Sequence, residues 1–418
     1  MLAVALLAVL VVALPALASD VPARSSDCPG SDCHPAAVSA VRWAARLPGD
    51  WSAGGTGGDG DGGTSPALGQ AYVAAGGTVA VVGSGLEVTG YTLATGQQAW
   101  QAELGEVPGT ALGSTIMSVR AWPGVVTVGL LAPDGRSRTE VVLSAATGDE
   151  LRRYPAAVFG GAVAASAKTT VVVGTAAVTS YDNKTGQVRW RRPVTGAQSW
   201  QTDGQTLYLA QTPAGPASSA RVTALKVIDL GTGAARTLSA PPGRPFAGTL
   251  AMAESGAVLF ASATGVTAYS GSTGGVLWAM GAAVPEGPDP AAGLAYLTSG
   301  GGDLLGVDPV TGTVLATVPA AAVAGSGAVF VVRDGIALGL GGGANGAAWE
   351  YSTGDGRVTW TSAALPWPHF FSDVSGLGGS AAVSGNEVVI ATCPRLGAAP
   401  RVCADPRLVA LALVAPAG

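Results

Sequence analysis

YDNKTGQVRW, residues 181–190, is the stretch that decides the fold. It predicts a strand, a tight turn and a second antiparallel strand, because a turn glycine stands between two runs of strand-forming residues. The same layout recurs along the chain. Copies that keep the terminal Trp are residues 91–100, 269–278 and 351–360, and copies that lack it are residues 143–152, 228–237 and 307–316.

Each position of this repeat has a physical reason. Glycine adopts the positive φ that a tight turn between antiparallel strands requires. Asp182, Asp229 and Asp308 can accept a hydrogen bond from the turn backbone two residues further on. The aromatic residues supply large apolar area with one polar group each that can find a partner. The turn glycines are Gly96, Gly148, Gly186, Gly233, Gly274, Gly312 and Gly356, and the repeat tryptophans are Trp100, Trp190, Trp278 and Trp360.

The spacing of the turn glycines identifies the architecture. Successive gaps are 52, 38, 47, 41, 38 and 44 residues, with a mean of about 43. A strand-rich repeat of roughly 40–45 residues is typical of a propeller blade of four strands. Solenoid β-helices have much shorter repeats, and no helical periodicity of useful length follows residue 20.

The two ends of the repeat region predict how the ring closes. The segment Val41–Leu47, which contains Trp43, resembles the strand after a turn although no turn precedes it, and Arg407–Leu413 resembles the strand before a turn. We therefore expect the N-terminal strand to complete the C-terminal blade, which removes exposed sheet edges. The predicted fold is all-β: an eight-bladed β-propeller of four-stranded antiparallel blades over residues 41–418.

The aromatic-Asp-x-x-Thr-Gly-x-x-x-Trp unit resembles the repeat of the PQQ-like (pyrroloquinoline-quinone-type) β-propellers, over about residues 41–418. That superfamily includes the quinoprotein alcohol dehydrogenases and the scaffold lipoprotein of bacterial outer-membrane assembly. Residues 43–83 resemble the opening strand, Gly-rich crossing and first blade of the latter subgroup. The resemblance implies the fold and leaves the activity open.

Residues 1–18 are almost wholly apolar and end in Ala16-Leu17-Ala18, the form of a signal-peptidase site. A cleaved signal peptide and a retained membrane anchor through residues 2–18 both fit this segment, and its lack of basic residues allows a start further upstream. Residues 19–40 are a polar tether. Both alternatives predict an extracytoplasmic protein, secreted or anchored to the membrane.

The chain contains four cysteines, which an exported protein would use in disulfides. We expect two local bridges, one in the tether and one clipping the connection between the last strands. A redox pair is the alternative, although no CxxC is present, and four residues between Cys28 and Cys33-His34 do not match a c-type haem site. The cysteines are Cys28, Cys33, Cys393 and Cys403.

Composition limits the classes of function. The net charge is −5 and no basic cluster stands out along the chain, which disfavours nucleic acid as a partner. Two histidines, His34 and His369, do not suffice for a hydrolase triad or a His-rich metal site. Asp59 and Asp61 lie in the Gly-rich segment 51–69, which we interpret as a flexible link rather than a calcium loop.

Binding on propellers usually lies in loops around the central channel. Longer spacings predict longer loops at residues 120–138, 200–221 and 367–379. The aromatic segment 365–371, around His369, could contact a ligand at the channel or pack between blades.

Three functions fit the sequence. The first is a monomeric, non-enzymatic propeller without a cofactor that binds a protein or a cell-envelope component, and this is our prediction. The second, implied by the resemblance, is a PQQ- and calcium-dependent dehydrogenase; the adjacent Cys-Cys pair of those enzymes is absent, and acidic candidates are Asp149, Glu150, Asp203 and Asp303. The third is an extracytoplasmic sensor of a small ligand.

Overall fold

The structure is a computed structural model, and it describes residues 41–47, 51–52, 72–107, 113–157, 160–174, 176–194, 197–212, 222–240, 246–289, 293–318, 329–333, 336–340, 348–352, 357–361, 381–384, 387–392, 402–403 and 406–412. Every regular element in these residues is a β-strand. The all-β prediction is therefore confirmed.

The described strands form eight four-stranded antiparallel sheets. We number them by the chain order of the strand at one end of each sheet, and these end strands are β3, β7, β11, β15, β19, β23, β27 and β31. Sheet 1 is β3 (Tyr72–Gly76), β4 (Val79–Ser84), β5 (Glu87–Thr92) and β6 (Gln98–Glu103). Sheet 2 is β7 (Thr115–Trp122), β8 (Val125–Leu131), β9 (Arg138–Ser144) and β10 (Glu150–Ala156). Sheet 3 is β11 (Gly161–Ala165), β12 (Thr169–Val173), β13 (Ala177–Asp182) and β14 (Val188–Pro193). Sheet 4 is β15 (Ala197–Thr202), β16 (Thr206–Gln211), β17 (Ala224–Asp229) and β18 (Ala235–Ser239).

The remaining sheets follow the same plan. Sheet 5 is β19 (Thr249–Glu254), β20 (Ala257–Ser262), β21 (Gly265–Ser270) and β22 (Val276–Gly281). Sheet 6 is β23 (Ala283–Asp289), β24 (Leu294–Ser299), β25 (Leu304–Val307) and β26 (Val314–Val318). Sheet 7 is β27 (Val329–Arg333), β28 (Ile336–Leu340), β29 (Ala348–Ser352) and β30 (Arg357–Thr361). Sheet 8 is β31 (Ala381–Ser384), β32 (Glu387–Thr392), β34 (Arg407–Ala412) and β1 (Val41–Arg46).

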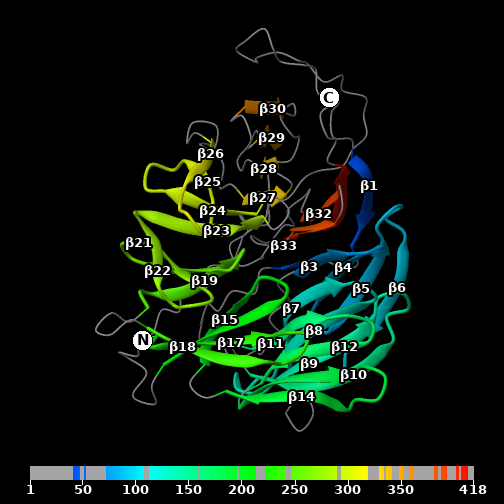
Figure 1. Cartoon of the computed structure of the whole chain (residues 1–418). Helices are drawn as coiled ribbons and strands as arrows, with labels where there is room; N and C mark the ends of the chain where they lie inside the picture. The colour runs from blue at the N-terminus through cyan, green and yellow to red at the C-terminus, as the bar shows by residue number, and fades with distance from the viewer. Residues whose placement is uncertain are drawn as a thin grey trace, which may run out of the picture.

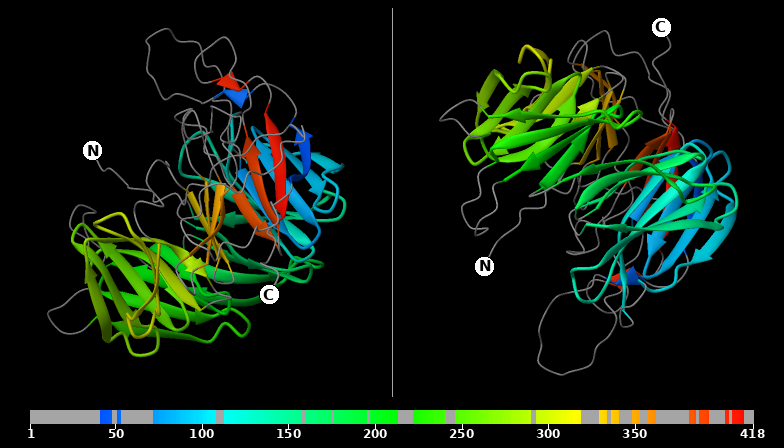
Figure 2. Two further views of the ribbon diagram at one scale, coloured as in Figure 1. Left: turned by 90° about the horizontal axis from the view of Figure 1, so that it is seen from above. Right: turned by 60° about the horizontal axis from the view of Figure 1, so that its bottom comes forward.

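The sheets are arranged as propeller blades are. The first strands of neighbouring sheets contact one another: β3 lies against β7 and β31, β19 lies against β15 and β23, and β23 also contacts β27. In Figure 1 these first strands lie toward the middle of the molecule and the fourth strands, such as β6, β14, β22 and β26, toward its periphery. Two further views show the sheets side by side around this middle (Figure 2).

The N-terminal strand has the partner that the chain ends predicted. β1 pairs antiparallel with β34, from Val41 opposite Leu411 to Arg46 opposite Arg407, and so becomes the fourth strand of sheet 8. A second pairing near this blade was not predicted from the sequence. β33 (Val402–Cys403) is separate and pairs with β2 (Trp51–Ser52), a strand inside the segment that we interpreted as a link.

The repeat turns have the predicted backbone. Gly96, Gly148, Gly186, Gly233, Gly274 and Gly312 all have φ between +68° and +75°, and Gly356 lies outside the described residues. Asp182 and Asp229 accept from the amide three residues on: Thr185 N to Asp182 Oδ1 is 2.8 Å, and Thr232 N to Asp229 Oδ1 is 2.7 Å. Asp308 Oδ1 accepts from both Val310 and Thr311. Each carboxylate therefore closes its own turn.

The repeat Trp joins one sheet to the turn of the next. The indole Nε1 of Trp43 donates to Leu93 O, that of Trp100 to Ala145 O, and that of Trp278 to Pro309 O, each acceptor standing three residues before a turn glycine. The ring then covers the glycine itself. A Cβ on Gly233 would lie 2.6 Å from the Trp190 ring, so a side chain there would collide with it. Trp43, Trp100, Trp190 and Trp278 therefore pack at the joints between sheets.

Arginine makes the equivalent joint where a copy lacks Trp. Arg152 occupies the Trp position of its copy, and its Nη2 donates to Lys184 O, 2.7 Å away in the next turn. Arg236 Nη2 likewise donates to Gly271 O at 3.0 Å. A guanidinium supplies several donors. Arg236 reaches the carbonyl three residues before Gly274, as the indoles do, and Arg152 reaches the carbonyl two residues before Gly186.

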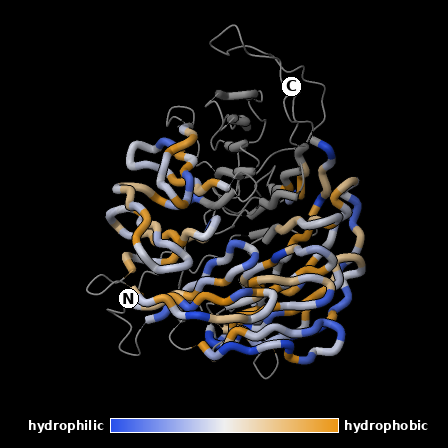
Figure 3. Tube along the Cα trace, in the orientation of Figure 1, coloured by the Kyte–Doolittle hydropathy of each residue, from blue (hydrophilic) through white to orange (hydrophobic). Residues whose placement is uncertain are grey.

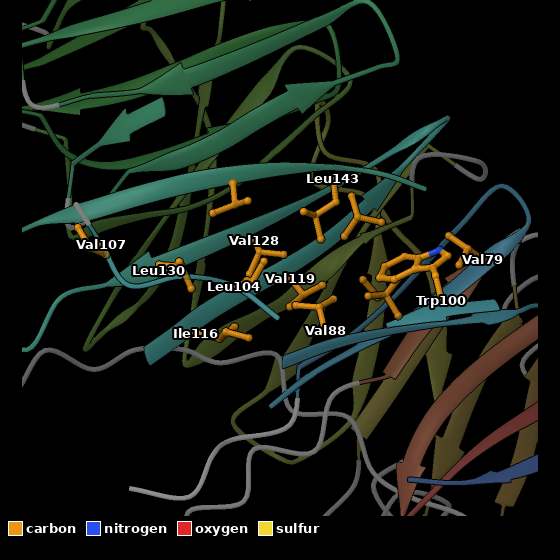
Figure 4. Close-up of a cluster of buried hydrophobic side chains, with 14 of the residues drawn as sticks. Val79, Val88, Trp100, Leu104, Val107, Ile116, Val119, Val128, Leu130 and Leu143 are labelled. Carbon is orange, nitrogen blue, oxygen red and sulfur yellow. The ribbon is translucent and has the colours of Figure 1, made fainter. Parts of the chain in front are cut away.

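Shared apolar cores lie between the sheets. The core of sheets 1 and 2 gathers Val88, Trp100 and Leu104 against Ile116, Val128 and their neighbours (Figure 4). Comparable buried clusters join sheets 2 and 3, 3 and 4, 4 and 5, and 5 and 6. Hydrophobic segments run along the strands in the hydropathy view (Figure 3). Each buried Val or Leu contributes about 1.5–3 kcal/mol to this packing.

The described residues of two predicted long loops are mostly strand. Residues 120–138 contain the end of β7, all of β8 and the first residue of β9. Residues 200–221 contain the end of β15 and all of β16. Residues 213–221 of this second segment lie outside the described residues. The third predicted loop, at residues 367–379, lies outside the described residues.

Candidate functional site

The fourth strands of sheets 5 and 6 carry the main concentration of exposed apolar side chains in the described part of the chain. Five large hydrophobic residues are between 37% and 56% exposed here, out of eight such residues among those described. Isolated exposed hydrophobics are normal, but a group of them marks an interaction surface. We name this group the β22–β26 patch. It consists of Val276 and Leu277 of β22, Val310 of the turn between β25 and β26, and Val314 and Leu315 of β26.

The joint between the two sheets brings these residues together. Trp278 follows Leu277 directly and donates its Nε1 to Pro309 O at 2.9 Å, next to Val310. The Trp278 ring also lies against Gly312, two residues before Val314. The patch is therefore held by a buried contact beneath it, and its shape is set before any partner arrives.

Leu277 and Leu315 occupy equivalent positions three residues after a turn glycine. At each of them the register shifts: Tyr269 pairs with Val276 and Ala268 with Trp278, so Leu277 is the extra residue of a β-bulge. Leu315 is the extra residue between Val314 and Ala316 in the same way. A bulge redirects side chains at a sheet edge. The equivalent residue in sheet 3 is Arg189, which is exposed and charged.

Such a surface can bind an apolar face of another macromolecule. It offers rigid backbone, exposed Val and Leu side chains and no chemical nucleophile. Each Val or Leu side chain that becomes fully buried in a complex contributes about 1.5–3 kcal/mol to the binding free energy. The chemistry of the patch is therefore recognition.

A second, polar cluster lies where sheets 2, 3 and 4 meet, and sequence reasoning missed it. Arg138 Nη2 lies 2.8 Å from Glu140 Oε1, and the two side chains are only 11% and 2% exposed. The same Nη2 donates to Ser118 Oγ at 2.8 Å. A Cβ at Gly129 or Gly161 would fall within 3 Å of these groups, so the two glycines make the space that the ion pair fills.

Arg120 extends this cluster across three sheets. From β7 its Nη1 donates to Ala162 O of β11, and its guanidinium carbon lies 4.9 Å from the centre of the Trp200 ring on β15. Burial lowers the pKa of Arg120; Glu140 opposes that change and Arg138 adds to it. The guanidinium nevertheless stays protonated at neutral pH. A cation over an aromatic face contributes about 0.5–2 kcal/mol, so this cluster joins the sheets.

The acidic residues proposed for a quinone site do not converge. Asp149 accepts from Thr147 Oγ1 in a turn, and Glu150 pairs with Arg153 at 2.7 Å. Asp203 accepts from the amides of its own turn, and Asp303 stands in the turn between β24 and β25. Within the described residues, no group of three or more His, Cys, Asp or Glu side chains could hold a metal ion. The carboxylates of Asp149 and Asp203 thus close their own turns.

Several predicted features fall outside the described residues. They include residues 1–40 with Cys28, Cys33 and His34, the Asp59–Asp61 segment, Cys393, Trp367–Gly379 and the turn of Gly356. Cys403 and Trp360 are described only by the backbone of β33 and β30, so the disulfides stay a prediction. No helix long and apolar enough to cross a membrane occurs in the part of the chain that the structure describes.

Comparison with known proteins identifies relatives only at the level of the fold. No protein-family model matches the chain, and no curated protein matches it. Similar solved structures include BamB from Moraxella catarrhalis, with 18% sequence identity, a TM-score of 0.41, and coverage of 68% of this chain and 79% of that chain. A europium-containing methanol dehydrogenase has 13% identity and a TM-score of 0.47, covering 88% and 93%.

A third similar structure is the C-terminal WD40 domain of Sif2, with 9% identity, a TM-score of 0.46, and coverage of 83% of this chain and 97% of that domain. Likeness at this level concerns the arrangement of strands, and function has to be argued from surfaces and side chains.

Proposed function

We propose that this protein is a non-enzymatic, extracytoplasmic β-propeller that binds a protein partner of the cell envelope through the β22–β26 patch. The observation that carries the proposal is the clustering of Val276, Leu277, Val310, Val314 and Leu315 on two neighbouring outer strands. Exposed apolar groups of this kind are costly to leave in water and mark protein-binding surfaces.

The proposal includes one closed ring of eight blades. Eight four-stranded sheets, the contacts of β3 with β7 and β31, and the pairing of β1 with β34 support it. A closed ring leaves no sheet with an open inner edge and makes a rigid platform. Such a platform lets a partner bind with little ordering of the propeller itself, which favours affinity.

The test is a pull-down with chemical cross-linking from envelope fractions, comparing the full chain with its Leu277→Arg/Leu315→Arg variant. Arg189 stands at the same bulge position in sheet 3, so the strand geometry accepts arginine there. We expect a stoichiometric partner with the unchanged chain and its loss with the variant, because two exposed leucines that the partner would cover become charged. The thermal midpoints of the two chains should agree.

The matched control is Arg189→Leu, which places leucine at the equivalent bulge outside the patch. This variant should retain the partner. Two outcomes would contradict the proposal: capture of the same partner by the double arginine variant, or uptake of a quinone with calcium accompanied by alcohol-dependent dye reduction. The second outcome would make the protein a dehydrogenase.

A further inference from the structure

A cavity of about 260 Å³ opens between β10 of sheet 2 and the outer strands of sheet 3. Ala156, Val172 and Ala177 line it and are buried. Tyr181 forms one wall and is held in place by stacking on Tyr154, with ring centres 4.1 Å apart. The floor is thus apolar, and it continues the core shared by the two sheets.

The rim of the cavity combines one cation with one exposed apolar side chain. Arg191 of β14 lines the cavity and is exposed to solvent, and Val188 lines it with 54% of its surface exposed. The register places Arg191 opposite Thr179, whose side chain also lines the cavity. Apolar, hydroxyl and guanidinium groups therefore face the same small space.

Three further exposed cations stand on the same part of sheets 2 and 3. Arg152, Lys184 and Arg189 are all exposed, on β10, on the turn between β13 and β14, and on β14. They are spread over 38 residues of sequence, from 152 to 189, so only the fold gathers them. The nearby acid Asp182 is occupied by its own turn, where Thr185 N and Oγ1 both donate to it.

The size of the cavity distinguishes between occupants. Sites for whole small molecules usually measure about 300–1,000 Å³, and this cavity is smaller, with room for one large apolar side chain. Arg191 on its rim selects a carboxylate, which a guanidinium binds with two parallel hydrogen bonds. The cavity is separate from the β22–β26 patch, so its occupant is independent of the partner proposed for that patch.

We infer that this groove binds an acidic peptide segment of a partner protein, with one apolar side chain in the cavity and a flanking carboxylate on Arg191. The apolar side chain gains burial against Ala156, Val172 and Tyr181. The flanking carboxylates gain charge-assisted hydrogen bonds and an association rate that rises as salt is lowered.

The test is fluorescence anisotropy of the full chain with three labelled peptides: Glu-Glu-Leu-Glu-Glu, Glu-Glu-Gly-Glu-Glu and Gln-Gln-Leu-Gln-Gln. We expect the first to bind more tightly than the other two. Arg191→Gln should weaken that binding by up to about fivefold, the upper range for one exposed ion pair. Ala176→Phe should weaken it similarly, because Ala176 lines the cavity and is exposed, so the larger side chain fills the space.

Arg189→Gln is the matched control, since it removes one charge from the same strand at a residue that does not line the cavity. It should change binding less than twofold. Equal losses for Arg189→Gln and Arg191→Gln, or no effect of Ala176→Phe in a chain with an unchanged thermal midpoint, would overturn the inference. So would Arg191-dependent binding to phosphatidylserine vesicles with no binding of the leucine peptide, which would assign the groove to a membrane surface.

Discussion

At the scale of single residues, the contact of Trp190 with Gly233 shows how the repeat works. Gly233 has φ +71°, and its missing Cβ leaves the place that the indole of the preceding sheet occupies. Two requirements therefore coincide at one position: a left-handed backbone and space for a ring. This is why the turn glycine and the repeat tryptophan recur together in the sequence.

We predict that Gly233→Ala destabilises the protein more than Gly256→Ala does. Gly256 also has a positive φ, +79°, but nothing lies within 4 Å of its would-be Cβ. Both substitutions carry about 1–2 kcal/mol of backbone strain, and only Gly233→Ala adds an overpacking cost of about 1–3 kcal/mol. Urea unfolding of the two variants measures the difference. Equal losses in the free energy of unfolding would mean that the Trp190 ring moves aside without cost.

One buried tyrosine lacks the hydrogen-bond partner that its residue type predicts. We expected each aromatic polar group to find a partner, but among the described residues the buried Tyr91 hydroxyl has no hydrogen-bond partner. Burial, with a smaller contribution from Glu87, raises the pKa of Tyr91 to about 12. Tyr269 behaves as expected, since its hydroxyl accepts from Ala247 N at 3.0 Å.

At the scale of the element, the strand–turn–strand unit is closed by its aspartate. The Thr185 amide is the main cause of the lowered pKa of Asp182, the Thr232 hydroxyl that of Asp229, and the Thr311 amide that of Asp308. A carboxyl group whose pKa is lower in the folded protein stabilises it above the unfolded pKa, about 3.9 for Asp. That stabilisation is lost as the pH falls toward the lowered values.

We predict a fall in the thermal midpoint as the pH decreases from about 4 to about 2, the window set by an unfolded Asp pKa of about 3.9 and lower folded values. A chain with Asp182→Asn, Asp229→Asn and Asp308→Asn should show a shallower fall in that window. Glu106 and Asp134, whose pKa values are also lowered, remain as a background in both chains. Parallel pH profiles for the two chains would show that the turn carboxylates contribute nothing.

The elements also show what the sequence could predict and where prediction failed. The turn, its glycine and the Trp are local patterns, so they could be recognised directly. The Arg138–Glu140 pair and the contact of Arg120 with Trp200 form between sheets and depend on Gly129 and Gly161 leaving space. No local sequence pattern predicts these contacts.

The β22–β26 patch did leave a signal that could have been found. Aligning the repeat copies shows that the position three residues after the turn glycine is Ala99, Leu151, Arg189, Arg236, Leu277, Leu315 or Thr359. Leucine in consecutive copies at a bulged position of an outermost strand indicates exposed apolar surface. The alignment does not show how buried each side chain is. Leu151, at the same position in sheet 2, is half-buried.

At the scale of the whole molecule, the proposed ring depends on the N-terminal strand. β1 supplies the fourth strand of sheet 8, and its Trp43 donates to Leu93 O of sheet 1, so one segment joins the two ends of the repeat array. Trp43 and Leu93 are 50 positions apart in the sequence, and their hydrogen bond connects sheet 8 to sheet 1.

We predict that a chain lacking residues 1–46 has a lower thermal midpoint than a chain lacking residues 1–40 and self-associates at high concentration. Removing β1 exposes the edge of β34, and an open strand edge pairs with other chains. Differential scanning calorimetry and sedimentation velocity measure the two effects. Identical behaviour of the two shortened chains would contradict closure by β1.

The central claim, that the β22–β26 patch is the partner-binding surface, is tested most directly by photo-cross-linking in the intact cell envelope. A photoreactive phenylalanine is placed at Leu315 in one chain and at Arg189, the equivalent bulge of sheet 3, in another. We predict a single discrete adduct from position 315 and none of the same mass from position 189. The same adduct from both positions, or an adduct from position 189 alone, would contradict the claim.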